Sequence, residues 1–171
     1  MSDNRQILPE LVVTDIDGVW TDGGMYYGQD GEELKKFHTY DSAGILFCQM
    51  LNIPTAIITG EHTQIVENRA NKLKVTYLYQ GVKNKLATLE MLCNELGISL
   101  SEVAYIGDDL NDIKVLKAVG YSYAPQNAPR YIKSVVSKVT TKAGGEGAFR
   151  EMVEDIIGEK NIDKIIDDLL Q

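Results

Sequence analysis

Two aspartates, Asp15 and Asp17, flank a single isoleucine directly after a short apolar run, and Gly18 follows them. On extended backbone this alternation points both carboxylates to the same side. Two like charges so close together are costly unless a cation offsets them, and a glycine after them allows a sharp turn that exposes amides to an anion. The pattern favours a site for a cation and an anion, although a helix N-cap beside a turn, or part of a calcium loop, would also fit.

Three more carboxylates, Asp108, Asp109 and Asp112, occur together in the segment GDDLND at residues 107–112. Several carboxylates without a histidine or cysteine partner offer hard oxygen ligands, which suit Mg²⁺ rather than Zn²⁺. A single aspartate before a helix could simply cap it. Five aspartates in two matched places exceed what capping needs, so the sequence predicts a magnesium site.

Two further polar groups have types that suit phosphate. Thr59 and Gly60 follow an apolar run, where a hydroxyl and free amides at the start of a helix would form an anion cradle; a plain N-cap threonine is the alternative. Lys85 lies early in a helical segment, where a cation is disfavoured unless an anion pairs with it. Alone, Lys85 could equally be a solvated lysine like its neighbour Lys83.

The elements that position these groups alternate along the chain. Short apolar runs predict buried strands at residues 11–13, 56–58, 77–79, 103–106 and 121–123. Apolar residues spaced three and four apart predict helices at residues 42–51, 63–72, 84–96 and 111–119. This alternation predicts an α/β fold, a doubly wound, Rossmann-like parallel sheet covered on both faces. All four polar motifs follow strands, so they should converge at the carboxyl edge of the sheet, where such folds bind ligands.

One segment interrupts the alternation. Residues 25–27 and 33–37 flank a stretch with turn chemistry, which predicts a β-hairpin flap after the first strand. The C-terminal part predicts two further helices, at residues 148–157 and 163–169, preceded by the glycine cluster at residues 144–147. The small residues of that cluster permit another backbone to approach closely, so the cluster could lie over a neighbouring active site. The alternative is that it is simply a loop at the start of a helix.

Composition limits the function classes. The chain has 171 residues, so we expect a single domain spanning residues 1–171. Its net charge is −8 (17 basic and 25 acidic side chains), which disfavours nucleic-acid partners. Cys48 and Cys93 lie in apolar stretches and read as core residues. The polar N-terminus, Met1 to Glu10, has no apolar signal core, and no apolar run is long enough to span a membrane. We expect a cytoplasmic location without membrane partners.

Taken together, these residues resemble the haloacid dehalogenase superfamily of phosphotransferases. The resemblance consists of D-x-D-G-V-x-T after the first strand, a threonine after the second, a later lysine, and G-D-D-x-x-D after the fourth. It covers nearly the whole chain in the family's order. Segments 15–23, 31–37, 79–81, 84–86, 103–110 and 144–151 look more narrowly like the capless subgroup that dephosphorylates 3-deoxy-2-keto sugar acids, on eight-carbon octulosonate 8-phosphate or nine-carbon nononate 9-phosphate.

The resemblance implies an aspartyl-phosphate mechanism. Asp15 would be the nucleophile, and Asp17 would protonate the leaving sugar oxygen and then activate water. Mg²⁺ would be held by Asp15, the backbone carbonyl of Asp17 and Asp108, with Asp109 and Asp112 orienting this cluster. Phosphate and substrate would be bound by Thr59, Lys85, Gly18, Thr21 and Gly60.

The resemblance also implies a homotetramer. The chain has no room for a cap domain at the usual insertion points, so hairpins and neighbouring subunits would close the site; a hairpin packed on its own domain is the alternative. Glu61 resembles the residue of the nononate enzymes, which makes nononate 9-phosphate the preferred substrate and octulosonate 8-phosphate the alternative. Arg69 and Lys72 share a helix face, which would bind the substrate carboxylate in a neighbour's site or be merely solvated.

Two other classes compete with the phosphatase. A signalling receiver domain also combines a doubly wound sheet with carboxylates, a threonine and a lysine, but its phospho-accepting aspartate should lie at a middle strand. Here Thr59 follows a middle strand and Asp15 follows the first. A catalytically idle domain of the same fold would not need the complete set of Asp15, Asp17, Lys85 and Asp108.

Overall fold

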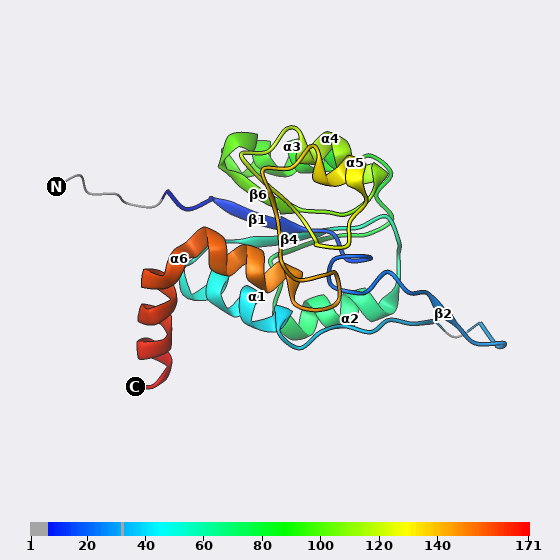
Figure 1. The fold of residues 1–171 in the computed structure, drawn as a ribbon, viewed down its shortest axis with the longest axis horizontal. Helices are drawn as coiled ribbons and strands as arrows, with labels where there is room; N and C mark the ends of the chain where they lie inside the picture. The colour runs from blue at the N-terminus through cyan, green and yellow to red at the C-terminus, as the bar shows by residue number, and fades with distance from the viewer. Residues whose placement is uncertain (1–6, 32) are drawn as a thin grey trace.

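A six-stranded parallel sheet forms the centre of the molecule (Figure 1). The computed structural model describes residues 7–31 and 33–171. In spatial order the strands are β5 (Tyr77–Tyr79), β4 (Thr55–Ile58), β1 (Leu11–Thr14), β6 (Val103–Ile106), β7 (Tyr121–Ala124) and β8 (Lys138–Val139). The chain starts in the middle, winds outward through β4 and β5, and returns to the other side of β1. This doubly wound order confirms the predicted fold and creates a crevice beside β1.

Strand β1 is paired on both sides, with β4 through Val12 opposite Thr55 and with β6 through Leu11 opposite Val103. All four of its residues are buried. Strands covered on both faces are predominantly apolar, which explains why residues 11–13 form an unbroken apolar run in the sequence.

Helices cover both faces of the sheet (Figure 1). One face carries α1 (Asp41–Met50), α2 (Gln64–Leu73) and α6 (Ala148–Leu169), and the other carries α3 (Lys85–Leu96), α4 (Ile113–Leu116) and α5 (Arg130–Lys133). Cys48 lies in the hydrophobic core between the sheet and α1, α2 and α6, and Cys93 lies in the core on the opposite face. Both are buried free thiols. Their prediction as core residues is confirmed.

One expectation about element boundaries needs correction. The helix predicted at residues 111–119 is a 3₁₀ turn, η2 (Leu110–Asp112), followed by the short α4. The turn is tight because the Asp112 carboxylate accepts amide hydrogen bonds from the chain before it. The two predicted C-terminal helices are confirmed: the element α6 is broken at Gly158, whose φ of 74° and ψ of 159° are not helical, so two helical segments meet there at a kink (Figure 1). Short β8, α5 and the 3₁₀ turn η1 (Leu100–Glu102) were not predicted.

The predicted hairpin is present as β2 (Tyr26–Tyr27) antiparallel to β3 (Glu33–Leu34), and it projects away from the sheet (Figure 1). Tyr26, Tyr27 and Leu34 are exposed by 50%, 67% and 64%. At the base, Phe37 packs edge-on against the buried Trp20. The tip of the hairpin is therefore not packed on its own domain, and only its base is anchored.

The glycine cluster is a helix-start loop that packs within its own chain. Gly147 is the N-cap of α6, and the amide of Gly145 donates to the carbonyl of Val19. A Cβ atom on Gly144 would lie 1.8 Å from the carbonyl oxygen of Gly18. Only glycine permits this close approach to the loop after β1.

Within the described ranges, 7–31 and 33–171, no helix combines the length and hydrophobicity that a membrane span requires. The expectations for the N-terminal stretch and for a single domain over the whole chain include residues 1–6, which lie outside the described residues.

Candidate active site

The first wall of the site is the turn that follows β1. The amide of Asp15 donates to the carbonyl of Ile106 in β6, which continues the sheet pairing for one more residue. The carbonyl of Ile16 then accepts the amides of Val19, Trp20 and Thr21. The chain therefore leaves extended geometry after Asp15. Asp17 lies in a turn, and not on the extended backbone that the sequence pattern predicted.

The turn has its own clamp. The Thr21 hydroxyl oxygen accepts the amides of Gly18 and Gly23, each at 3.2 Å, and Thr21 is buried. Gly18 has φ +85°, a left-handed conformation that favours glycine. The structure thus places Thr21 beneath the turn as its organiser, and not on the surface of the pocket.

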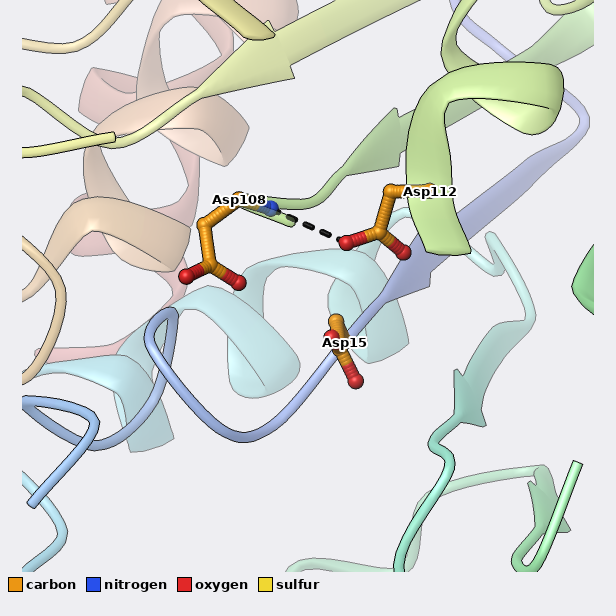
Figure 2. Close-up of side chains that lie close together, drawn as sticks. All are labelled: Asp15, Asp108 and Asp112. Atoms are coloured by element: carbon orange, nitrogen blue, oxygen red, sulfur yellow. Dashed lines mark hydrogen bonds between the residues drawn. The ribbon is translucent and has the colours of Figure 1, made fainter. Parts of the chain in front are cut away.

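The second wall follows β6. Asp112 accepts hydrogen bonds from the amides of Asp108 and Asp109 at 3.0 and 3.1 Å on Oδ2, and from the Tyr105 hydroxyl at 2.5 Å on Oδ1. The Asp109 side chain accepts the amide of Leu110 at 2.7 Å and caps the turn. Asp112 thus fixes the loop that carries Asp108, as Figure 2 shows.

Lys85 links the two walls. It is the first residue of α3, whose N-cap is Asn84. Its ammonium lies 2.7 Å from Asp15 Oδ2 and 2.7 Å from Asp112 Oδ1, and its side chain is fully buried. The anion expected beside a lysine at a helix start is therefore, in this structure, a pair of carboxylates.

Negative charge exceeds positive charge at the centre. Burial, with the charge of Asp112, raises the pKa of Asp15 to about 7, although Lys85 opposes this. Burial, with the charges of Asp15, Asp112 and Asp109, raises the pKa of Asp108 to about 8. Both pKa values are raised because the two carboxylates are buried among other negative charges, with too little positive charge nearby to offset them.

The donor set fits a hard divalent cation. Carboxylate oxygens of Asp15, Asp108 and Asp112 lie within 4.8 Å of one another (Figure 2). Asp112 is already engaged by four donors, whereas Asp15 Oδ1 and Asp108 Oδ1 are buried and have no hydrogen-bond partner within residues 7–31 and 33–171. Asp15 and Asp108 are therefore the carboxylates available to an ion, and oxygen-only ligands suit Mg²⁺.

A pocket of about 270 Å³ opens between the walls. Its lining includes the predicted site residues Asp15, Asp17, Gly18, Thr59, Gly60, Glu61, Asp108 and Asp109, together with Gly23 and Asn111. Motifs from three separate parts of the chain thus line one pocket at the carboxyl edge of the sheet. Lys85 does not line the pocket, but it contacts the pocket residue Asp15 from the protein interior.

The Thr59 segment differs from its expected form. Thr59 and Gly60 follow β4 as predicted, but α2 begins only at Gln64, and its N-cap is Thr63, whose hydroxyl accepts the amide of Val66. The N-cap alternative for Thr59 is therefore wrong, and so is the idea that helix-start amides lie beside it. The intervening loop is held instead by Val82, whose amide donates to the Thr59 carbonyl at 3.0 Å.

Two predicted substrate residues lie elsewhere in the protomer. Arg69 donates to the Ser42 hydroxyl at 3.1 Å, and its guanidinium lies 5.6 Å from the ring centroid of Phe37. Lys72 is exposed in the last turn of α2. Neither lines the pocket.

Sequence reasoning missed three residues near the site: Lys35, Tyr105 and Asn111. The Lys35 ammonium lies 2.6 Å from Asp17 Oδ1. Asn111 stands inside the GDDLND segment, so its position was available as a signal. Lys35 and Tyr105 lie in predicted strands. There, a polar group within a strand was the only sequence feature that could have pointed to a role near the site.

Comparisons with known proteins identify the relatives of this chain. Residues 55–152 match the family model of haloacid dehalogenase-like hydrolases. The 3-deoxy-D-manno-octulosonate 8-phosphate phosphatase of Escherichia coli K12 is 43% identical over 144 residues, which cover 84% of this chain and 77% of that protein. The crystal structure of the same enzyme from Yersinia pestis superposes with a TM-score of 0.87 at 40% identity, covering 94% of this chain and 86% of that one. The structure of the 3-deoxy-D-manno-octulosonate 8-phosphate phosphatase from Moraxella catarrhalis, in complex with a magnesium ion, a phosphate ion and a KDO molecule, superposes with a TM-score of 0.91 at 36% identity, covering 96% of this chain and 94% of that one.

Proposed function

This chain belongs to the haloacid dehalogenase-like hydrolases, and on that premise we propose that it removes phosphate from a 3-deoxy-2-keto sugar acid by way of an aspartyl-phosphate. It is a phosphoric monoester hydrolase that uses Mg²⁺. The observation that carries the proposal is the convergence of Asp15 and Asp108 on one pocket beside the first strand, with the buried Lys85 in contact with Asp15. A cytoplasmic location stays a prediction from the sequence.

In the first half-reaction, the Asp15 carboxylate attacks phosphorus, and the bond between phosphorus and the sugar oxygen breaks. Asp17 donates its proton to the departing oxygen, which leaves as an alcohol. In the second half-reaction, Asp17 takes a proton from water, whose oxygen displaces Asp15 from phosphorus and releases inorganic phosphate. Both aspartates line the pocket, so one phosphoryl group can contact both.

The remaining residues stabilise charge on the transferring group. Thr59, Gly60 and Gly18 line the pocket where phosphoryl oxygens would lie, and Lys85 holds Asp15 from beneath. Asp15, Asp108 and the backbone carbonyl of Asp17 would hold Mg²⁺, with Asp109 and Asp112 orienting the loop. When bound, the ion supplies positive charge that offsets the clustered carboxylates and the phosphoryl oxygens.

We propose nononate 9-phosphate as the preferred substrate. Glu61 is exposed at the pocket wall, where its carboxylate can accept hydrogen bonds from sugar hydroxyls but would repel the substrate's own carboxylate. A nine-carbon chain places that carboxylate farther from a phosphate bound at Asp15 than an eight-carbon chain does. Octulosonate 8-phosphate is the second candidate, because the relatives reported above are named for it.

We further propose that the active assembly is a homotetramer. The exposed tyrosines of the hairpin tip, Tyr26 and Tyr27, offer apolar surface that a neighbouring subunit would cover. Arg69 and Lys72 do not reach the pocket of their own protomer, so their proposed contact with a substrate carboxylate requires a neighbour. Replacing both tyrosines with serine should dissociate the assembly in sedimentation experiments. It should also impair turnover of the sugar acid phosphate more than turnover of a small aryl phosphate.

Two experiments test the function. A phosphate-release screen over eight-carbon and nine-carbon keto-deoxy acid phosphates and hexose phosphates should show the highest kcat/KM for the nine-carbon acid; equal rates on all of them would overturn the proposed substrate class. Asp15→Asn should reduce Mg²⁺-dependent phosphate release at least about 10³-fold, because it removes the nucleophile. Activity that survives this change would contradict the mechanism.

A further inference from the structure

The hairpin places one buried cation against the active site. Lys35 follows β3, and its ammonium lies 2.6 Å from Asp17 Oδ1 and 3.3 Å from Glu33 Oε1. Its side chain is only 1% exposed, whereas that of its neighbour Lys36 is 67% exposed. Burial alone would lower the pKa of Lys35, but the hydrogen bond to Asp17 and the negative charges of Asp17 and Glu33 outweigh it and raise that pKa.

A buried ammonium of this kind is costly unless its partners are well placed. Lys35 could have pointed into solvent from a projecting hairpin, as Lys36 does. Instead it crosses back to the turn after β1 and holds one oxygen of Asp17. The other oxygen, Asp17 Oδ2, has no hydrogen-bond partner in the part of the chain that the structure describes.

This contact restricts how the Asp17 carboxyl group can rotate. Asp17 lines the pocket, and its side chain is 26% exposed. It is not held by the network that fixes the other carboxylates, because Lys85 contacts Asp15 and Asp112. Among the residues that the structure describes, Lys35 is the cation in contact with the Asp17 carboxylate.

We propose that Lys35 is a positioning residue that orients Asp17 for proton transfer to the leaving oxygen, and that it thereby makes this step depend on the placement of the hairpin. The inference rests on the proposed role of Asp17 as the proton donor. A small displacement of a proton donor reduces the rate steeply. Loss of Lys35 should consequently slow the departure of poor leaving groups and leave good ones nearly unaffected.

Two nearly isosteric substrates separate this role from a structural one. p-Nitrophenyl phosphate releases a stabilised phenolate that leaves without protonation, whereas phenyl phosphate releases a more basic one that benefits from it. The first-turnover release of each phenol, measured before the steady state, isolates the first half-reaction. Lys35→Met should slow this release about 10- to 100-fold for phenyl phosphate, within the range of general acid catalysis, and no more than about threefold for p-nitrophenyl phosphate.

The reference variant is Asp17→Asn, which should show the same leaving-group dependence in stronger form. The matched control is Lys36→Met, which should leave both rates unchanged. If Asp17→Asn slows both substrates equally, the role of Asp17 as proton donor fails, and this inference fails with it. If Asp17→Asn discriminates between them and Lys35→Met does not, only the inference fails.

Loss of a buried cation could also loosen the hairpin. Thermal unfolding of Lys35→Met and of Lys35→Gln, whose amide can still donate a hydrogen bond, would detect this. A purely structural role predicts an equal loss on both substrates in both variants, and that result would overturn the proposal. Partial recovery of phenyl phosphate turnover in Lys35→Gln would support it.

Discussion

A Cβ atom on Gly18 would lie 1.9 Å from Oδ2 of Asp108. The turn that carries Asp15 and the loop that carries Asp108 are therefore in contact at a position that admits only glycine. Gly18 also has φ +85°, so a side chain there would be strained as well as obstructed.

Gly18→Ala should displace Asp108 and abolish measurable turnover, with Mg²⁺ binding weakened at least about tenfold because an ion ligand moves. Gly97→Ala is the matched control: Gly97 has φ +70°, and no described atom lies within 4 Å of its added Cβ. Both variants incur backbone strain of about 1–3 kcal/mol. Similar thermal shifts with activity lost only in Gly18→Ala would separate the clash from the strain, and an active Gly18→Ala enzyme would contradict this geometry.

Magnesium binding should strengthen as pH rises from 6 to 9. The pKa values of Asp15 and Asp108, about 7 and about 8, mean that protons compete with the ion at the lower pH. We expect apparent affinity to increase at least about tenfold over this range, with proton release visible in calorimetry in buffers of different ionisation enthalpy. Chelation with EDTA should abolish turnover, and excess Mg²⁺ should restore it. An affinity independent of pH would argue against these carboxylates as ligands.

Tyr105→Phe should lower kcat about 3- to 30-fold while KM changes little. The hydroxyl of Tyr105 shares Asp112 Oδ1 with Lys85. Its loss should let Asp112 and Lys85 shift, and Lys85 contacts Asp15, the proposed nucleophile. Tyr123→Phe removes a similar hydrogen bond, to Asp155 at 2.5 Å, outside the pocket. Each variant should lose stability of about 1.5–3 kcal/mol, measured by denaturant unfolding, but only Tyr105→Phe should affect kcat. Equal kcat values would show that the hydroxyl serves stability alone.

Asp41→Asn should make the protein more stable above pH 7 than the unaltered chain. Burial raises the pKa of Asp41 to about 7, although the amide of Arg150 and the charges of Arg69 and Arg150 oppose this. The folded state therefore holds a proton that the unfolded chain releases near its ordinary pKa of 3.8. The stability that this proton contributes is fully present below pH 3.8, the ordinary pKa, and is lost as pH rises through the folded-state pKa of about 7.

The difference in unfolding free energy between Asp41→Asn and the unaltered chain should grow between pH 4 and pH 8, by an amount on the order of a few kcal/mol. Asp155→Asn provides a control of opposite sign. Burial opposes the shift at Asp155, but hydrogen bonds from Lys138 and Tyr123 lower its pKa, so its removal should cost more at neutral than at acid pH. Parallel pH profiles for the Asp41 variant and the unaltered chain would refute the assignment.

The sequence alone determined the sheet and the edge at which the site lies. A strand buried on both faces is predominantly apolar, as residues 11–13 of β1 are. Parallel strands place their carboxyl ends at one edge of the sheet. The positions of Asp15, Thr59 and Asp108 after three such strands were therefore predictable. Their convergence follows from topology, before any side-chain contact is known.

Only the tertiary structure decided what each side chain does. Lys35 could have faced solvent, Asp112 could have been a metal ligand, and Arg69 could have pointed to the pocket. The structure instead pairs Lys35 with Asp17, surrounds Asp112 with four donors, and holds Arg69 against Phe37 and Ser42. Such outcomes depend on distances between segments far apart in the chain, which local residue patterns do not encode.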